Sequence, residues 1–431
     1  MFYAYLGIVI CLVFAIFYYR KEKLIINPVT VFSVEWAVIL FFSSLSLLTL
    51  YTPQDSTYML IFYGIISFLL GYVLDRHFFS KINRKKRTKV CYLNYNFVYF
   101  LLIVTILYYV FDLYRIINTV GSFTLQNVQR VLQDGVVEYN NTPFRVLFLL
   151  LFVQPGSIVL PVVASVDFWF GKKKKFLLIG TLIMLIIKML ASASRSTLIS
   201  FIIYFIISGF ISLYTKKKRI VSIATSKYLK KNKKLINYSL ILGFLLFGLM
   251  TVSRGATIAR NLYLNFAMPP IMFEKWIKNI ANPNLIAYGQ ASLNGFFYLI
   301  IWPFSKLLGV NMPELFSQVY DLIMNTDTQW QWIGDKIIAN AYVSLFWFGY
   351  VDGKLIGIII ESFIFGWVNA ITFRNAIKYT SQQNVAIYCM MFYSVLFSFV
   401  RMQFSMANFA ISFIYILFFI YKTKKVSGDE V

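Results

Sequence analysis

The chain has 431 residues, of which 59% are hydrophobic and only 13% are charged. This composition excludes an ordinary soluble globular protein and indicates several membrane-spanning helices. The formal net charge of +24 would suggest a nucleic-acid partner in a soluble protein. Here most basic residues lie in loops between apolar segments, where they contact anionic lipid headgroups and set the topology, so no nucleic acid is expected.

Eleven apolar segments approach or exceed the length of about 20 residues that a helix needs to cross a bilayer. They are residues 2–19, 29–50, 57–74, 93–113, 144–170, 176–191, 197–214, 235–252, 353–373, 385–400 and 409–421. The predicted fold class is therefore all-α, with a single polytopic membrane domain over residues 1–431. Positive charge follows the first segment and does not precede it, the reverse of a cleavable signal peptide, so we expect an anchor with its N-terminus outside.

Lysine-rich stretches predict the orientation of these segments. They lie at 20–23, 81–89, 172–175, 216–234 and 422–425. All of them are cytoplasmic if the chain starts outside and ends inside, as the positive-inside rule requires. The largest loop on the other side is then 253–352, which we expect to be partly helical. Within it, Gly295–Leu308 is apolar but interrupted by Pro303. We interpret this stretch as interfacial or re-entrant, because a full crossing would invert the later lysine-rich loops.

Several kinds of catalytic site lack their residues in this sequence. The single histidine, His77, lies in a predicted cytoplasmic loop, although histidine is the usual general base near neutral pH and the commonest metal ligand. There is no HExxH, zinc-binding Cys/His, P-loop or GxSxG motif. The positions of the three cysteines predict no disulfide framework. We therefore expect a site on the outer face that uses neither a metal nor a cofactor.

Arginines occur in the predicted non-cytoplasmic turns, against the usual bias of basic residues. Arg195 lies in the five-residue turn Ser192–Ser196. Arg254 and Arg401 each follow the end of a span, and Arg260 lies further along the outer loop. Because a fixed guanidinium binds phosphate oxygens bidentately, we interpret Arg195, Arg254 and Arg401 as one anion clamp. The alternative is that a terminal arginine only extends to lipid phosphates, and we favour it for Arg115, Arg130 and Arg145.

Two carboxylates of the large loop are candidate general bases. Asp335 and Asp352 flank the stretch Asn340–Ser344, which leads back toward the membrane, and either can accept a proton from a substrate hydroxyl. Asp352-Gly353 is equally typical of a turn or helix cap before a span, so both interpretations stay open. Charge inside a span is costly and makes a functional role the default hypothesis. Three residues qualify: Glu35, Lys188 and Glu361.

Two motifs resemble those of the oligosaccharide repeat-unit polymerases of bacterial surface polysaccharides, the O-antigen polymerase or Wzy type. Ser192-Ala-Ser-Arg-Ser196 is similar to the family's Gly/Ser-Ser-Arg turn. Asn340-Ala-Tyr-Val-Ser344, followed by Gly349-Tyr-Val-Asp352-Gly353 and Gly357, is similar to its Asn-x-Tyr/Phe-Thr and Tyr-x-Asp-Phe-Gly-x-x-Gly. The chain departs from this pattern where Gly353 and Lys354 follow the aspartate without the usual aromatic residue. The predicted spans and large outer loop extend the likeness over nearly the whole chain.

The resemblance implies a glycosyltransferase in the bacterial cytoplasmic (inner) membrane, with its site facing the periplasm or cell exterior. Such enzymes move a glycan from polyprenyl diphosphate to a hydroxyl of an incoming lipid-linked repeat unit, and a chain-length regulator is a candidate partner. Arginines would stabilise the leaving diphosphate. On this interpretation Asp352, Arg195 and Arg254 are catalytic. Four residues would bind substrate: Arg260, Arg401, Asp335 and Tyr342.

Other functions remain open from the sequence. A lipid-linked oligosaccharide flippase also needs a cationic cavity for the diphosphate, but it does not need a large structured outer loop. An O-antigen ligase resembles the chain in its spans and loop, yet that family relies on an outer histidine, which is absent here. A purely structural membrane protein would leave the outward arginines unexplained.

Replacing Arg195 or Arg254 with alanine should abolish the glycan polymer without loss of membrane insertion, because the diphosphate loses a charged partner. Lysine should restore only part of the polymer, since it lacks the planar fork of arginine. Surface-glycan gels and immunoblots of membrane fractions measure the two effects. Normal polymer from both alanine variants would contradict the anion clamp.

Overall fold

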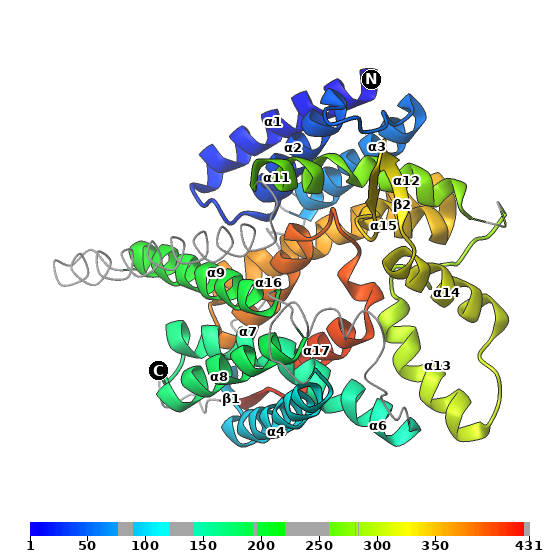
Figure 1. Ribbon diagram of the computed structural model, residues 1–431. Coiled ribbons are helices and arrows are strands. Elements are labelled where there is room, and N and C mark those ends of the chain that lie inside the picture. The colour runs from blue at the N-terminus through cyan, green and yellow to red at the C-terminus, as the bar shows by residue number, and fades with distance from the viewer. Residues whose placement is uncertain are drawn as a thin grey trace. The chain divides into compact units, whose positions relative to one another are not determined.

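The computed structural model describes residues 1–75, 89–120, 142–192, 196–219, 258–280, 282 and 284–425, and it is built mainly from helices (Figure 1). Among these residues, eight helices are long and apolar enough to cross a membrane. The all-α, multi-pass class predicted from the sequence is confirmed at this level. The strands form only two short antiparallel pairs within the described parts of the chain.

Eight of the eleven predicted spans coincide with these candidate helices. They are Phe2–Glu22, Pro28–Leu45, Asp55–Leu74, Tyr95–Thr119, Pro143–Phe170, Lys175–Ser192, Thr197–Thr215 and Ser344–Tyr379. The predicted spans 385–400 and 409–421 coincide with shorter helices, Gln382–Leu396 and Ala407–Phe418. The predicted span 235–252 lies outside the described residues. The exact number of spans and the N-outside orientation stay predictions.

The chain divides into two compact units, each assembled from distant stretches of sequence. The first contains Met1–Lys85, Phe244–Arg374 and Met391–Ala407, and the second contains Lys86–Gly243, Asn375–Met390 and Asn408–Val431. Helices α15 (Ser344–Tyr379) and α16 (Gln382–Leu396) contribute residues to both units.

The first unit holds the N-terminal helices and most of the predicted outer loop. Helix α1 packs along α2 and α3, and α11 and α12 cover α2. Apart from its parts of α15 and α16, the elements of this unit are α1 (Phe2–Glu22), α2 (Pro28–Leu45), α3 (Asp55–Leu74), α11 (Ile258–Ala267), α12 (Pro269–Lys278), α13 (Asn294–Leu308), α14 (Glu314–Thr328), β2 (Gln331–Gly334), β3 (Ile337–Ala339) and the short 3-10 helix η3 (Gln403–Ser405). The predicted outer loop is thus largely helical where it is described, and β2 and β3 form a hairpin.

Glycine allows α3 and α15 to cross at backbone contact in the first unit. A Cβ atom at Gly71 would collide with the backbone carbonyl of Phe363, and one at Gly366 would collide with that of Phe68. The two glycines therefore let each helix approach the other's main chain directly, which is how apolar helices pack in a bilayer.

Helix α15 breaks between Asp352 and Leu355. Gly353 has φ −168° and ψ 28°, and Lys354 has the left-handed φ of 54°, so neither residue is helical. Beyond the break the chain packs against the segment before it, because a Cβ at Gly357 would collide with the carbonyl oxygen of Gly349. The break lies at the position where the sequence allows a turn or helix cap, and Gly349 and Gly357 permit the close approach.

A carboxylate fastens α12 to the start of α3. Glu274 accepts hydrogen bonds from the Gln54 N–H at 2.7 Å, from Thr57 Oγ1 at 3.0 Å and from Lys278 Nζ at 2.5 Å. Burial would raise the pKa of Glu274, but these donors hold it below its ordinary value. Helix α12 of the predicted outer loop is therefore held to the candidate membrane-spanning helix α3 by hydrogen bonds to one carboxylate.

The second unit is a helical bundle with one small strand pair. Helix α4 packs on α8, and α7 packs on α9. Its elements are β1 (Lys89–Leu93), α4 (Tyr95–Val120), α6 (Pro143–Phe148), the π-helical turn η2 (Leu149–Val153), α7 (Gln154–Phe170), α8 (Lys175–Ser192), α9 (Ser196–Arg219), α17 (Ala407–Phe418) and β4 (Tyr421–Lys425). Strands β1 and β4 pair antiparallel, which ties the C-terminal stretch to the start of α4.

Hydrogen bonds at two places stabilise this bundle. Buried Asp167 accepts hydrogen bonds from the Tyr95 hydroxyl at 2.6 Å and from the Lys172 and Lys174 N–H groups at 3.1 and 3.0 Å, which closes the turn between α7 and α8. Pro155 has no N–H to donate to the Leu151 carbonyl one helical turn earlier. That carbonyl accepts a hydrogen bond from the Tyr415 hydroxyl at 2.6 Å.

Replacing Gly71 with valine should lower the thermal unfolding temperature of the purified protein in detergent, because α3 and α15 must separate to admit the side chain. Overpacking of this kind typically costs about 1–3 kcal/mol. Gly353→Ala is the matched control, since a Cβ there meets nothing within 4 Å. Equal unfolding temperatures for wild type and Gly71→Val would contradict the backbone contact.

Candidate functional site

The predicted site residues fall into two groups. Arg195 and Arg254 lie outside the described residues, so convergence of the three-arginine clamp stays a prediction. The other five belong to the first unit: Arg260, Arg401, Asp335, Tyr342 and Asp352. The structure brings two of these five, Arg401 and Tyr342, into one cluster.

Arg401 is the centre of this cluster. It follows α16 and is only 9% exposed. Its guanidinium donates through Nη1 to Oδ2 of Asp327 at 2.8 Å and through Nη2 to Oδ1, forming a bidentate ion pair at the end of α14. Nη1 also contacts the sulfur of Met406 at 3.1 Å. A charge this buried needs such compensation, because leaving either partner alone would strand a charge away from water.

The Asn340–Ser344 stretch is hydrogen-bonded to backbone carbonyls at or next to each partner of the ion pair. Asn340 Nδ2 donates to the Asp327 carbonyl at 2.6 Å, and the Ala341 N–H donates to the Thr326 carbonyl at 2.7 Å. On the other side, the Ser344 N–H donates to the Val400 carbonyl at 3.2 Å. Backbone hydrogen bonds therefore lock this motif between the end of α14 and the segment that carries Arg401.

This locked stretch has an unusual backbone. Ala341, Tyr342 and Ser344 all have left-handed φ values, of 55°, 55° and 67°. Residues with side chains rarely adopt this conformation, and it persists only where the surroundings enforce it, often at functional sites. It turns the Tyr342 ring against Phe399, with ring centroids 5.8 Å apart. Burial raises the pKa of Tyr342, so its hydroxyl stays protonated at neutral pH.

We call Asp327, Asn340, Tyr342, Phe399 and Arg401 the Arg401 cluster. It combines a fixed guanidinium, a neutral phenol and stacked aromatic rings, since Phe399 also stacks on Phe266 at 5.5 Å. Chemically, such a set can bind an anion beside a sugar face.

An intramembrane carboxyl group lies next to the same segment. Glu35, on α2, accepts a hydrogen bond from Ser398 Oγ at 3.3 Å, and Trp36 Nε1 donates to that hydroxyl at 3.3 Å. The Ser398 carbonyl in turn accepts the Leu345 N–H at 2.7 Å. Residues 398–401 thus contact both Glu35 and Asp327 within the first unit.

In the second unit, Lys188 donates to Ser157 Oγ at 2.8 Å and lies over the Tyr109 ring.

Asp352 lies elsewhere in the first unit and is fully engaged. Its Oδ1 accepts the Ala291 N–H and its Oδ2 accepts the Ser292 N–H, both at 2.8 Å. The Ser292 hydroxyl donates to Glu361. Asp352 and Glu361 therefore anchor the turn that precedes α13 against the break in α15.

Asp335 and Arg260 are exposed at the surface. Asp335 lies at the turn of the β2–β3 hairpin, where its backbone N–H donates to the Thr49 carbonyl at 3.2 Å. Arg260 lies in the first turn of α11. Among the described residues, neither side chain forms an ion pair.

Asp327 is not among the site residues predicted from the sequence. No local signal marks it, because its partner Arg401 is 74 residues away. The sequence does not indicate Phe399 and Ser398 as site residues either, because they resemble ordinary residues of an apolar segment. Within the described part of the chain, no group of three or more His, Cys, Asp or Glu side chains is placed to hold a metal ion.

No protein-family model matches this chain, and neither a curated protein nor a solved structure matches it. Inferences about its function therefore depend on the residues and their geometry.

Replacing Asp327 with asparagine should destabilise the first unit, because Arg401 keeps its charge but loses a charged partner. Breaking a fully buried pair costs about 3–5 kcal/mol, and the partial exposure of Asp327 reduces this to roughly 1–3 kcal/mol. Thermal unfolding in detergent measures the loss. The matched control is Asp321→Asn, which removes an exposed carboxylate from the same helix. Equal losses from the two substitutions would contradict a stabilising ion pair.

Proposed function

We propose that this chain is a membrane glycosyltransferase that polymerises lipid-linked oligosaccharide repeat units on the non-cytoplasmic face. The reaction would transfer a glycan from polyprenyl diphosphate to a sugar hydroxyl of an incoming lipid-linked unit. The oxygen–carbon bond to the diphosphate breaks, a glycosidic bond forms, and the acceptor hydroxyl loses its proton.

One observation carries the proposal. The sequence indicates Asn340–Ser344 as a site by its resemblance to a family motif. It indicates Arg401 for a separate reason, its predicted position outside the membrane. They are neighbours in the first unit, joined by the Ser344–Val400 hydrogen bond and by their common partner Asp327. A shared site gives both selections a single physical explanation.

Arg401 is suited to the leaving group. A guanidinium has five N–H donors in a fixed fork, and its contacts with Asp327 and Met406 use three of them. Within the described part of the chain the other two donors are not used, so they are available to a phosphate oxygen, and Asp327 holds them in one orientation. Charge that develops on the diphosphate would be stabilised by donors already in place, which is the most effective form of electrostatic catalysis.

The aromatic residues of the Arg401 cluster are suited to the sugar. Tyr342 and Phe399 supply rings against which an apolar sugar face can pack, and Asn340 adds an amide. On this proposal Tyr342 is a substrate-binding residue, as the resemblance implies. Arg195 and Arg254 remain candidates for the second phosphate.

The general base that would take the proton from the acceptor hydroxyl is a separate question. Both oxygens of Asp352 accept backbone N–H groups, and the residue is only 4% exposed, so a substrate hydroxyl has little access to it. The geometry therefore favours a positioning role for Asp352, which holds the turn before α13. Asp335, exposed at its hairpin, has no such restraint.

The surface-glycan profile of a strain that lacks this chain tests the proposal. A single repeat unit in place of a ladder, restored to a ladder by the wild-type gene, would support polymerisation. Loss of even the single unit, with lipid-linked units accumulating, would instead favour a ligase or a flippase, and the sidedness of those units would separate the two.

Substituting Arg401 with lysine should reduce the ladder strongly, by about the 10²–10³-fold in rate that one lost transition-state donor costs. Arg115→Ala is the control, since this arginine lies over the Phe111 ring in the second unit. Immunoblots of membrane fractions confirm equal protein. A normal ladder from Arg401→Lys would count against Arg401 as a phosphate-binding residue.

A further inference from the structure

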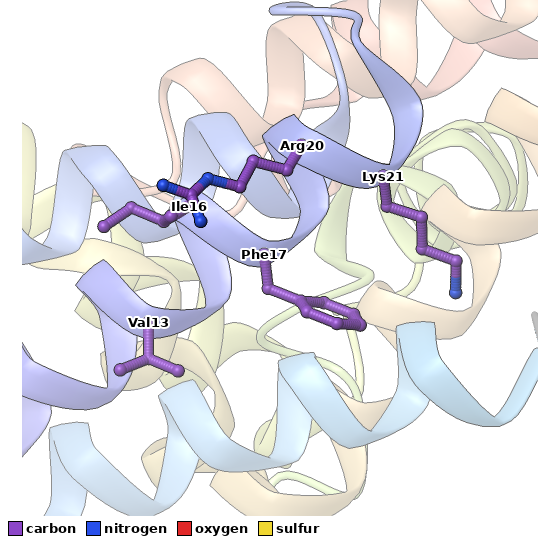
Figure 2. Close-up of a pocket in the computed structure, with 5 residues that line it drawn as sticks. All are labelled: Val13, Ile16, Phe17, Arg20 and Lys21. Atoms are coloured by element: carbon purple, nitrogen blue, oxygen red, sulfur yellow. The ribbon is translucent and has the colours of Figure 1, made fainter.

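The membrane-spanning helix α1 carries a hollow on its surface (Figure 2). Five residues line it: Val13, Ile16, Phe17, Arg20 and Lys21. Their spacing places them on one face of the helix, over about 12 Å of its axis. It has a volume of about 520 Å³ and is a shallow groove open on one side, not an enclosed cavity.

The hollow is apolar along its length and cationic at one end. Val13, Ile16 and Phe17 are 59%, 52% and 56% exposed, so this face of α1 is open to whatever surrounds the helix. In a membrane-spanning helix that surrounding is lipid. Arg20 and Lys21 lie in the last turn, where a helix that spans a bilayer meets the headgroups.

Lys21 lies over the apolar part of the hollow. Lys21 Nζ lies 5.6 Å from the Phe17 ring centroid and 5.5 Å from that of Tyr18, a cation–π geometry that points the ammonium back along the helix. Figure 2 shows Lys21 beside Phe17 and Arg20 beside Ile16. Glu22 is the one carboxylate of this turn, and Lys23 follows it, so the charge at the end of α1 remains positive.

We propose that this hollow binds one anionic phospholipid from the leaflet at the C-terminal end of α1. The phosphate contacts Arg20 and Lys21, and the first acyl carbons cover Ile16, Phe17 and Val13. Charge complementarity selects an anionic headgroup, and the apolar face selects a lipid over a soluble phosphate. This site is independent of the proposed glycosyltransferase activity and requires only that α1 spans the membrane.

Native mass spectrometry of the full, delipidated chain in detergent tests the proposal. The protein is titrated with phosphatidylglycerol or with phosphatidylcholine that has the same acyl chains. Wild type should retain phosphatidylglycerol preferentially. The double variant Arg20→Gln/Lys21→Gln should bind phosphatidylglycerol at least about tenfold more weakly, since each basic residue near the headgroups contributes to binding, while its binding of phosphatidylcholine should not change.

The matched control is Lys173→Gln/Lys174→Gln, which removes the same charge from the exposed turn before α8. It should leave the preference for phosphatidylglycerol intact. Equal loss in both double variants, or equal retention of the two lipids by wild type, would overturn the site. Because Arg20 and Lys21 are exposed, unfolding temperatures should match wild type. A lower temperature for Arg20→Gln/Lys21→Gln would assign these residues to packing and would also count against the site.

Discussion

A buried guanidinium must have its charge compensated, and the contacts around Arg401 in the first unit follow from that requirement. Asp327 compensates Arg401 in a bidentate pair, and the backbone around each partner then holds the Asn340–Ser344 stretch through hydrogen bonds. The same segment contacts Glu35 through Ser398. One ion pair thereby connects the end of α14, a left-handed stretch of backbone, the residues after α16 and a carboxyl group inside a span.

The later part of the second motif, from Gly349 to Gly357, has a structural explanation of its own. Gly349 and Gly357 permit the chain to pack against itself on either side of the break in α15, and Asp352 binds two backbone N–H groups of the turn before α13. These requirements alone account for the glycine and aspartate positions of the motif. The similarity of this stretch to the polymerase family is therefore weaker support for catalysis than the cluster around Arg401.

The sequence predicted the features that depend on local composition. Span length and hydrophobicity are properties of contiguous residues, so eight predicted spans coincide with candidate helices. The turn at Asp352-Gly353 was also predicted, because it is a local feature. Contacts between distant residues were not: the pairing of Arg401 with Asp327 has no local pattern, and alanine and tyrosine give no sign of the left-handed backbone at 341 and 342. The division into two units is equally invisible in sequence, since each unit collects separated stretches.

The most direct test of the central claim is elongation by the purified protein in liposomes, with a single polyprenyl-diphosphate-linked repeat unit as both donor and acceptor. The expected result is a series of products with two or more units and release of one polyprenyl diphosphate for each bond formed. Arg401→Lys should slow this series strongly when rates are compared at a temperature at which both proteins are folded. Absence of elongation by folded wild-type protein would contradict the polymerase proposal, and unchanged elongation by Arg401→Lys would contradict the site.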